Sequence, residues 1–120
     1  MIKSYKDLIV WQKSYNLSLL VYKVTKNFPK EEIYGLTSQT RRAVVSIPSN
    51  IAEGYCRQRK LEYVHFLQIS FGSGAELETQ LLIAKDLVYI SNKEFEELSN
   101  LLGEVMRMLN SLVSKIKTSA

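Results

Sequence analysis

A run of regularly spaced apolar residues near the end of the chain constrains the fold most. Between residues 95 and 116, apolar side chains recur at alternating steps of three and four, so they share one side of an α-helix over three heptads. This stripe consists of Phe95, Leu98, Leu102, Val105, Leu109, Leu112 and Ile116. Because a helix with such a stripe must bury it against other helices, the spacing predicts a helical bundle rather than a cofactor site.

Apolar periodicity and turn signals together predict four helices, and no segment has the alternating pattern of a strand. The expected helices cover residues 7–26, 36–55, 60–89 and 91–117. Pro29 prevents the first helix from continuing, and Ser91 and Glu94 have capping-box spacing at the start of the last. Helices of similar length with short connections are typical of an antiparallel up-and-down four-helix bundle. We therefore predict a single all-α domain spanning residues 1–120.

Pro48 lies inside the second predicted helix, where proline costs about 3 kcal/mol and removes the N–H that would bond to the Val44 carbonyl. In one interpretation the helix kinks, and Ser46 or Ser49 satisfies the freed backbone groups. In the other, one helix ends near Val45 and Pro48 occupies the first turn of the next. The apolar side keeps its phase across the proline, which favours one kinked helix.

Two glycines, Gly72 and Gly74, interrupt the third predicted helix. Each costs about 1 kcal/mol relative to alanine in a helix interior. Either the helix breaks there, or the missing side chains let another element approach closely. Apolar residues keep helical spacing on both sides, so we expect one long helix with a close-packing point.

The first predicted helix has two apolar stripes on opposite sides. One consists of Leu8, Trp11, Tyr15, Leu19 and Tyr22, and the other of Val10, Leu17, Val21 and Val24. One stripe can face the bundle core, and the other then faces a second subunit, unless the helix is wedged centrally in its own bundle. We assign the subunit interface to the stripe Val10, Leu17, Val21 and Val24.

Positive charge is concentrated in the first half of the chain. Residues 1–60 hold 11 Lys and Arg against 4 Asp and Glu, whereas residues 61–120 hold 5 against 8. A basic half indicates an anionic partner such as nucleic acid, although a solvated surface with a chance imbalance has the same composition.

Five basic residues are the candidates for nucleic-acid binding: Arg41, Arg42, Arg57, Arg59 and Lys60. Lys3, Lys6 and Lys13 add to them. Such side chains contact phosphates without reading sequence, and a ring of subunits would repeat the contacts. Arg41 and Arg42 point about 100° apart on a helix, so one of the two is expected to be structural. The alternative hypothesis is an oligomeric protein-interaction adaptor whose basic cluster meets an acidic protein surface.

Catalytic and metal-binding patterns are missing from the sequence. His65 is the only histidine and Cys56 the only cysteine, and their spacing matches no nucleophile pair or metal site. No phosphate-loop or dinucleotide fingerprint is present. We therefore expect no enzyme activity, no metal and no cofactor, and a partly buried His65.

The sequence has no pattern typical of a membrane or secreted protein. The apolar run Leu8–Trp11 is too short for a signal-peptide core, and no stretch approaches the roughly 20 apolar residues of a membrane span. We expect a soluble cytoplasmic protein with no membrane partner.

Several longer motifs resemble a known family. "LIVWQKS" at 8–14, "YGLTSQTRRA" at 34–43, "SIPSNIAEG" at 46–54 and "GSGAELET" at 72–79 are similar to the proteins encoded in intervening sequences of bacterial 23S rRNA genes. The resemblance implies antiparallel four-helix bundles that assemble as rings, typically homopentamers. It also implies a relation to the accessory variability determinant of diversity-generating retroelements, which engages a reverse transcriptase and nucleic acid. We expect a non-enzymatic oligomer that binds RNA or other nucleic acid through a repeated basic rim.

Overall fold

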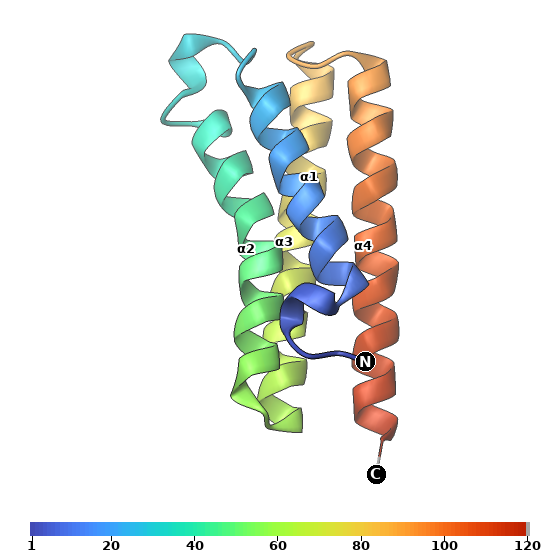
Figure 1. Ribbon diagram of the computed structural model, residues 1–120. Coiled ribbons are helices and arrows are strands. Elements are labelled where there is room, and N and C mark those ends of the chain that lie inside the picture. Colours follow the sequence, from blue (N-terminus) through green and yellow to red (C-terminus); the bar gives the residue numbers. More distant parts are fainter. Residues whose placement is uncertain (120) are drawn as a thin grey trace.

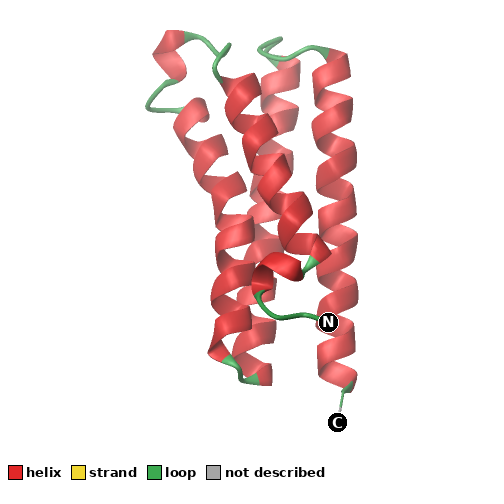
Figure 2. Ribbon diagram, in the orientation of Figure 1, coloured by secondary structure: helices red, strands yellow, loops and turns green. Residues whose placement is uncertain are grey.

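The computed structural model describes residues 1–119, and within that range it is entirely helical, with no strand (Figure 2). The long helices are α1 (Ile9–Thr25), α2 (Leu36–Arg57), α3 (Lys60–Asp86) and α4 (Asn92–Thr118); two short 3-10 helices are η1 (Tyr5–Asp7) and η2 (Lys30–Glu32). The prediction of four long helices is confirmed for the described residues.

Helix α4 begins with the predicted capping box. The Ser91 hydroxyl accepts a hydrogen bond from the Glu94 N–H, and the Glu94 carboxylate accepts one from the Ser91 N–H.

The four long helices lie side by side along a molecule of 49 × 24 × 21 Å (Figure 1). The α1–α2 and α3–α4 connections lie at one end, and the α2–α3 turn and the end of α4 lie at the other, with the chain start part-way along the bundle. Helix α1 packs on α2 and α4, and α3 packs on the same two helices. No helix within residues 1–119 is long and apolar enough to cross a membrane.

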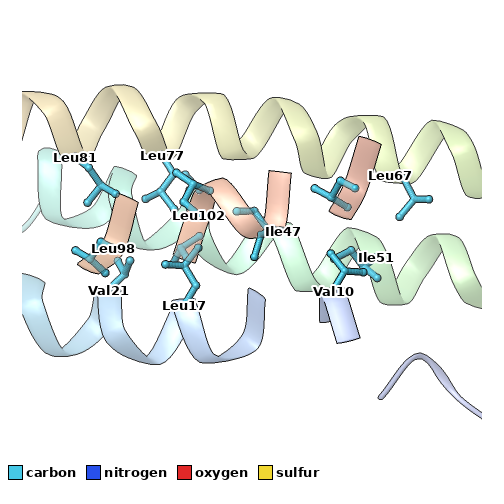
Figure 3. Packing of buried hydrophobic residues seen from close by; sticks show 14 residues of the cluster. Val10, Leu17, Val21, Ile47, Ile51, Leu67, Leu77, Leu81, Leu98 and Leu102 are labelled. Atoms are coloured by element: carbon cyan, nitrogen blue, oxygen red, sulfur yellow. The ribbon is translucent and has the colours of Figure 1, made fainter. Parts of the chain in front are cut away.

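All four long helices contribute to the core (Figure 3). The predicted stripe on α4 is confirmed. Leu98, Leu102, Val105 and Leu109 are buried, while Phe95, Leu112 and Ile116 pack against the same cluster from its edge. They meet side chains such as Leu17, Ile47 and Leu77 from the other helices. Each fully buried Leu or Ile stabilises the fold by about 1.5–3 kcal/mol relative to an exposed one, so this cluster holds the helices together.

The structure corrects the assignment of the α1 stripes. Val10, Leu17 and Val21 are only 4%, 0% and 1% exposed and belong to the chain's own core, and Val24 packs against it. This side of α1 also holds Ser14 and Ser18, whose small side chains bond to backbone carbonyls and let α1 sit close to α2. The predicted interface of Val10, Leu17, Val21 and Val24 is therefore wrong for this fold. In the opposite stripe of α1, Tyr15, Leu19 and Tyr22 are exposed.

Helix α2 continues without a break across Pro48, as the phase of its apolar side predicted. The Val44 carbonyl, which loses its N–H partner at Pro48, is bonded by a different residue from those expected. The Ser18 hydroxyl on α1 donates to the Val44 carbonyl at 3.3 Å while also lying 3.0 Å from the Ser14 carbonyl. Ser46 instead bonds to Ser73 on α3 at 2.8 Å. A neighbouring helix therefore satisfies the carbonyl that proline leaves free.

Helix α3 is also continuous, and the close-packing point lies at Gly74 rather than Gly72. A Cβ built on Gly74 would collide with the Met106 side chain on α4, whereas one on Gly72 would meet nothing within 4 Å. Gly54 on α2 is a second close approach, because its Cβ would lie 2.8 Å from the Phe66 Cβ and 3.2 Å from the Tyr63 carbonyl oxygen. The α2–α3 contact therefore depends on a residue without a side chain.

Candidate nucleic-acid interface

The turn between α2 and α3 places three of the predicted basic residues at one end of the bundle. Gln58 adopts the left-handed conformation with φ of 62°, which ends α2 and allows α3 to begin at Lys60. Arg57, Arg59 and Lys60 are all exposed, and the Arg59 side chain is 83% accessible. The turn therefore presents these side chains to solvent.

Two carboxylates lie among these three cations. Arg57 pairs with Glu53 at 3.0 Å and with Glu62 at 3.5 Å, and Arg59 lies 3.7 Å from Glu62. The Arg57 guanidinium also lies over the Phe66 ring, 5.1 Å from its centroid. Exposed pairs of this kind contribute only about 0–1 kcal/mol each, so a phosphate can replace a carboxylate as the partner.

Further lysines join this cluster from distant parts of the sequence. Lys60 Nζ contacts the backbone carbonyl of Ser119, so the last turn of α4, with Lys115 and Lys117, lies beside the α2–α3 turn (Figure 1). The chain start, which carries Lys3 and Lys6, lies farther along the bundle, because Tyr5 lines a groove with Pro48 and Ala52, several residues before α2 ends at Arg57. We call the remaining set the basic end: Arg57, Arg59, Lys60, Lys115 and Lys117.

Sequence reasoning did not include Lys115 and Lys117. They lie more than 50 positions from the basic run in the sequence. In the sequence they are two basic residues in the last turn of a helix. Basic residues are common there because they interact favourably with the helix dipole, so the pattern does not indicate a binding site. Only the arrangement of the helices brings them to the other cations.

Lys13, the remaining auxiliary lysine, does not join the basic end. Its Nζ lies 2.7 Å from a Glu104 carboxylate oxygen, which links α1 to α4. The hydrogen bond and the charge of Lys13 lower the pKa of Glu104 below its ordinary value. Lys13 is therefore engaged in contacts between helices.

Arg41 and Arg42 do not join the basic end either. Arg41 and Arg57 are 16 positions apart on α2, which corresponds to about 24 Å along the helix. Arg41 is half-buried: its Nε donates to Thr25 Oγ1 at 2.8 Å and its guanidinium lies over the Tyr22 ring, 4.6 Å from the centroid. Arg42 is exposed. Arg41 therefore contacts α1, whereas Arg42 lies on the surface of α2.

The tyrosines that flank the basic run pack on each other. The Tyr55 and Tyr63 rings are edge-to-face, with centroids 6.1 Å apart, and Tyr63 also packs against the core. Burial, with a smaller contribution from Tyr55, raises the pKa of Tyr63 to about 12. Tyr63 is thus a packing residue rather than a platform for a base.

The two candidates for reactive chemistry are both on the surface. Cys56 is exposed, and His65 is exposed rather than partly buried as expected. The ring of His65 lies edge-on to that of Phe66, with centroids 5.5 Å apart. In residues 1–119, no group of three His, Cys, Asp or Glu side chains is placed to hold a metal ion.

A groove between α1 and α2 is the other prominent surface feature. This aromatic groove has a volume of about 330 Å³ and is lined by Tyr5, Trp11, Tyr15, Val45 and Pro48 together with small residues. Trp11 stacks on Tyr15 at 5.1 Å between centroids and meets Tyr5 edge-on at 5.4 Å. Leu19, on the same helix, is 57% exposed. This side of the bundle therefore presents apolar side chains to solvent.

Comparison with known proteins identifies the family. Residues 6–111 match the family model described as 23S rRNA-intervening sequence protein. The chain belongs to this family. The resemblance of its sequence motifs is thereby confirmed.

A solved structure has a fold similar to that of this chain. The bundle is similar to the crystal structure of a protein of unknown function from the S23 ribosomal protein family of Bacteroides thetaiotaomicron. The TM-score is 0.79 at 24% identity, over 88% of this chain and 98% of that one. No curated protein matches the chain.

In this member of the 23S rRNA-intervening sequence protein family, the basic end is a cluster of long, exposed side chains from the end of α2, the start of α3 and the end of α4. In nucleic-acid complexes, Lys and Arg side chains contact phosphates without reading the sequence directly.

Proposed function

We propose that this protein is a non-enzymatic, oligomeric four-helix bundle that binds RNA or other nucleic acid through its basic end. The observation that carries the proposal is the gathering of five exposed Lys and Arg side chains at one end of the bundle. Two carboxylates, Glu53 and Glu62, lie among them and pair with Arg57 and Arg59.

The proposed assembly is a ring of antiparallel up-and-down bundles. The placement of the helix connections at alternating ends supports the antiparallel order (Figure 1). The exposed aromatic groove and Leu19 supply an apolar face that a second copy would bury. The pentameric number rests on the family resemblance. A ring repeats the basic end in every subunit, so simultaneous phosphate contacts strengthen binding without any new contact type.

A second candidate function is a protein-interaction adaptor. Leu61 lies between the basic residues of the α2–α3 turn and the rest of α3, and it is 87% exposed. An exposed leucine next to cations suits an acidic protein surface that also offers an apolar contact. Binding of a protein rather than RNA at this end would favour this candidate.

The test is a fluorescence-anisotropy titration of labelled structured RNA and duplex DNA. The wild-type protein is compared with the triple variant Arg57→Ala/Arg59→Ala/Lys60→Ala. The control is Lys23→Ala/Lys93→Ala/Arg107→Ala, which removes the same positive charge from exposed positions outside the basic end. The proposal expects weakened binding in the first variant only. Equal binding by all three proteins would contradict it.

A further inference from the structure

A second pocket between α1 and α2, which we call the cationic pocket, adjoins the aromatic groove at Val45. It has a volume of about 460 Å³. Thr37, Ser38, Arg41 and Arg42 form its polar lining, and Tyr22, Ile33 and Val45 form its apolar walls. This pocket adjoins the α1–α2 connection, at the opposite end of the bundle from the basic end (Figure 1).

The two arginines of the cationic pocket have no carboxylate partner among residues 1–119. Thr25, the Tyr22 carbonyl at 3.4 Å and the Tyr22 ring hold Arg41 in place. A half-buried guanidinium loses part of its hydration, and an anion in the pocket would offset that loss. Arg42 is exposed beside it and makes no ion pair in the described chain.

Thr37 supplies an independent observation. Thr37 is only 6% exposed and lines the pocket, and its hydroxyl makes no hydrogen bond within the described residues. It is not a fully buried unpaired group, since Gln80 Oε1 is the one such side-chain atom in the described chain, so the Thr37 hydroxyl opens on the pocket. The comparable Thr40 instead donates to the Leu36 carbonyl at 2.7 Å. A ligand oxygen in the pocket would take the place of solvent at the Thr37 hydroxyl.

The start of α2 adds backbone donors. Glu32 accepts the Leu36 N–H through one oxygen at 3.0 Å and the Tyr89 hydroxyl through the other, also at 3.0 Å. The N–H groups of Thr37 and Ser38 have no acceptor in residues 1–119. Free N–H groups at the N-terminus of a 22-residue helix favour negative charge.

We propose that the cationic pocket binds a phosphate group, held by Arg41, Arg42 and the Thr37 hydroxyl at the start of α2. A phosphate carries two negative charges and several acceptor oxygens, which match two guanidinium groups, two hydroxyls and two free N–H groups. The proposal is independent of nucleic-acid binding at the basic end, because the two sites share no residue. The phosphate comes either from a small molecule or from the end of a nucleic-acid strand.

The test is an NMR titration of the ¹⁵N-labelled full chain with inorganic phosphate, AMP and a 5′-phosphorylated oligonucleotide at constant ionic strength. At least one of these ligands is expected to shift the Thr37 and Ser38 amide signals in a saturable way. Arg42→Gln and Thr37→Val should each weaken that binding about tenfold, since each removes a hydrogen bond to a charged group. Arg42 is exposed and valine keeps the shape of threonine, so both variants should fold. Arg57→Gln at the basic end is the matched control and should leave the binding unchanged.

The ligands separate the two sources of the phosphate. Saturable binding of inorganic phosphate or AMP indicates a small molecule. Binding confined to the 5′-phosphorylated oligonucleotide, and lost with its 5′-hydroxyl counterpart, indicates a strand end. If none of the three ligands gives a saturable shift at Thr37 and Ser38, or if both pocket variants bind as tightly as the wild type, the proposal is overturned. Binding at the basic end is unaffected by either result.

Discussion

At the residue scale, two non-glycine residues in the left-handed conformation terminate helices. Gln58 and Val88 both have φ of 62°. The conformation of Val88 lets the Tyr89 N–H donate to the Ala84 carbonyl at 2.8 Å, which closes the end of α3. A β-branched residue is strained in this region, because its Cβ crowds the backbone. Val88 is 83% exposed, so it gains little from packing in return. The predicted end of α3 at residue 89 was therefore too late, since no glycine marks this stop.

Replacing Val88 with glycine should stabilise the protein. Glycine adopts a positive φ without crowding, so Val88→Gly is expected to raise the free energy of unfolding by about 1 kcal/mol. Leu87→Gly is the matched control, because Leu87 is adjacent and exposed but has φ of −82°. That control should lower the stability. Thermal and urea denaturation followed by circular dichroism measure both changes. A Val88→Gly variant less stable than the wild type would contradict the statement that Val88 is strained.

Tyr63 predicts a pH dependence of stability at high pH. Its pKa is raised to about 12 in the folded protein, against an ordinary value of 10. Its contribution is fully present below pH 10, where both states keep the phenolic proton. It is lost as the pH rises towards 12, because the unfolded chain releases the proton first. Urea denaturation between pH 9 and pH 12 should show the wild type losing more stability than Tyr63→Phe. Parallel losses in the two proteins would count against a raised pKa.

At the element scale, the contact between α2 and α3 depends on small residues as much as on apolar ones. Gly54 lies against Phe66 and Tyr63, and the Ser70 hydroxyl donates to the Ile47 carbonyl at 2.9 Å. The bond between Ser46 and Ser73 connects the same two helices. These contacts keep α2 and α3 close on both sides of Pro48.

A pair of glycine substitutions separates close packing from helix propensity. Gly54→Ala should destabilise the protein by about 1–3 kcal/mol, because its Cβ would lie 2.8 Å from the Phe66 Cβ. Gly72→Ala should stabilise it by about 0.5–1 kcal/mol, since it lies in a helix with nothing within 4 Å. Chemical denaturation of both variants measures the difference. Similar effects of the two substitutions would mean that the α2–α3 approach is less close than described.

The sequence predicts the elements well and the orientation of helices poorly. Apolar periodicity predicted α2 through Pro48 and α3 through Gly72 and Gly74, because a core face keeps its phase when the local residue is unfavourable. It could not show which stripe of α1 is buried. That choice depends on Ser14 and Ser18, which contact backbone carbonyls and allow close packing. Hydrophobicity alone does not reveal such contacts.

At the scale of the whole molecule, the sequence also does not reveal which distant residues the helices bring together at the candidate site. The run Arg57, Arg59 and Lys60 is visible in the sequence, whereas its proximity to Lys115 and Lys117 depends on how the helices pack. Arg41 and Arg42 belong to the same family motif as residues of the α2 core, yet they line a different pocket at the other end. The chain therefore has two cationic regions where the sequence suggested one.

If the protein forms the proposed ring, a charged substitution on the exposed apolar side of α1 should lower the mass of the assembly in solution. Leu19 is 57% exposed and lies on the apolar side of α1, so Leu19→Glu should leave the fold intact but place a charge in the subunit interface. We expect light scattering to show a smaller species than the wild type. Leu82→Glu, at a 43% exposed leucine on α3, is the control and should keep the wild-type mass. A wild-type protein of monomeric mass would rule out the ring.

The salt dependence of RNA binding tests the central claim most directly. Each phosphate contact to single-stranded nucleic acid contributes about −0.7 to the slope of log K against log salt concentration. The account predicts a steep negative slope for the wild type. Arg57→Ala/Arg59→Ala/Lys60→Ala should make that slope shallower by about two for each subunit that contacts the RNA. Absence of binding by the folded protein, or an unchanged slope in the triple variant, would contradict the assignment of the basic end to nucleic acid.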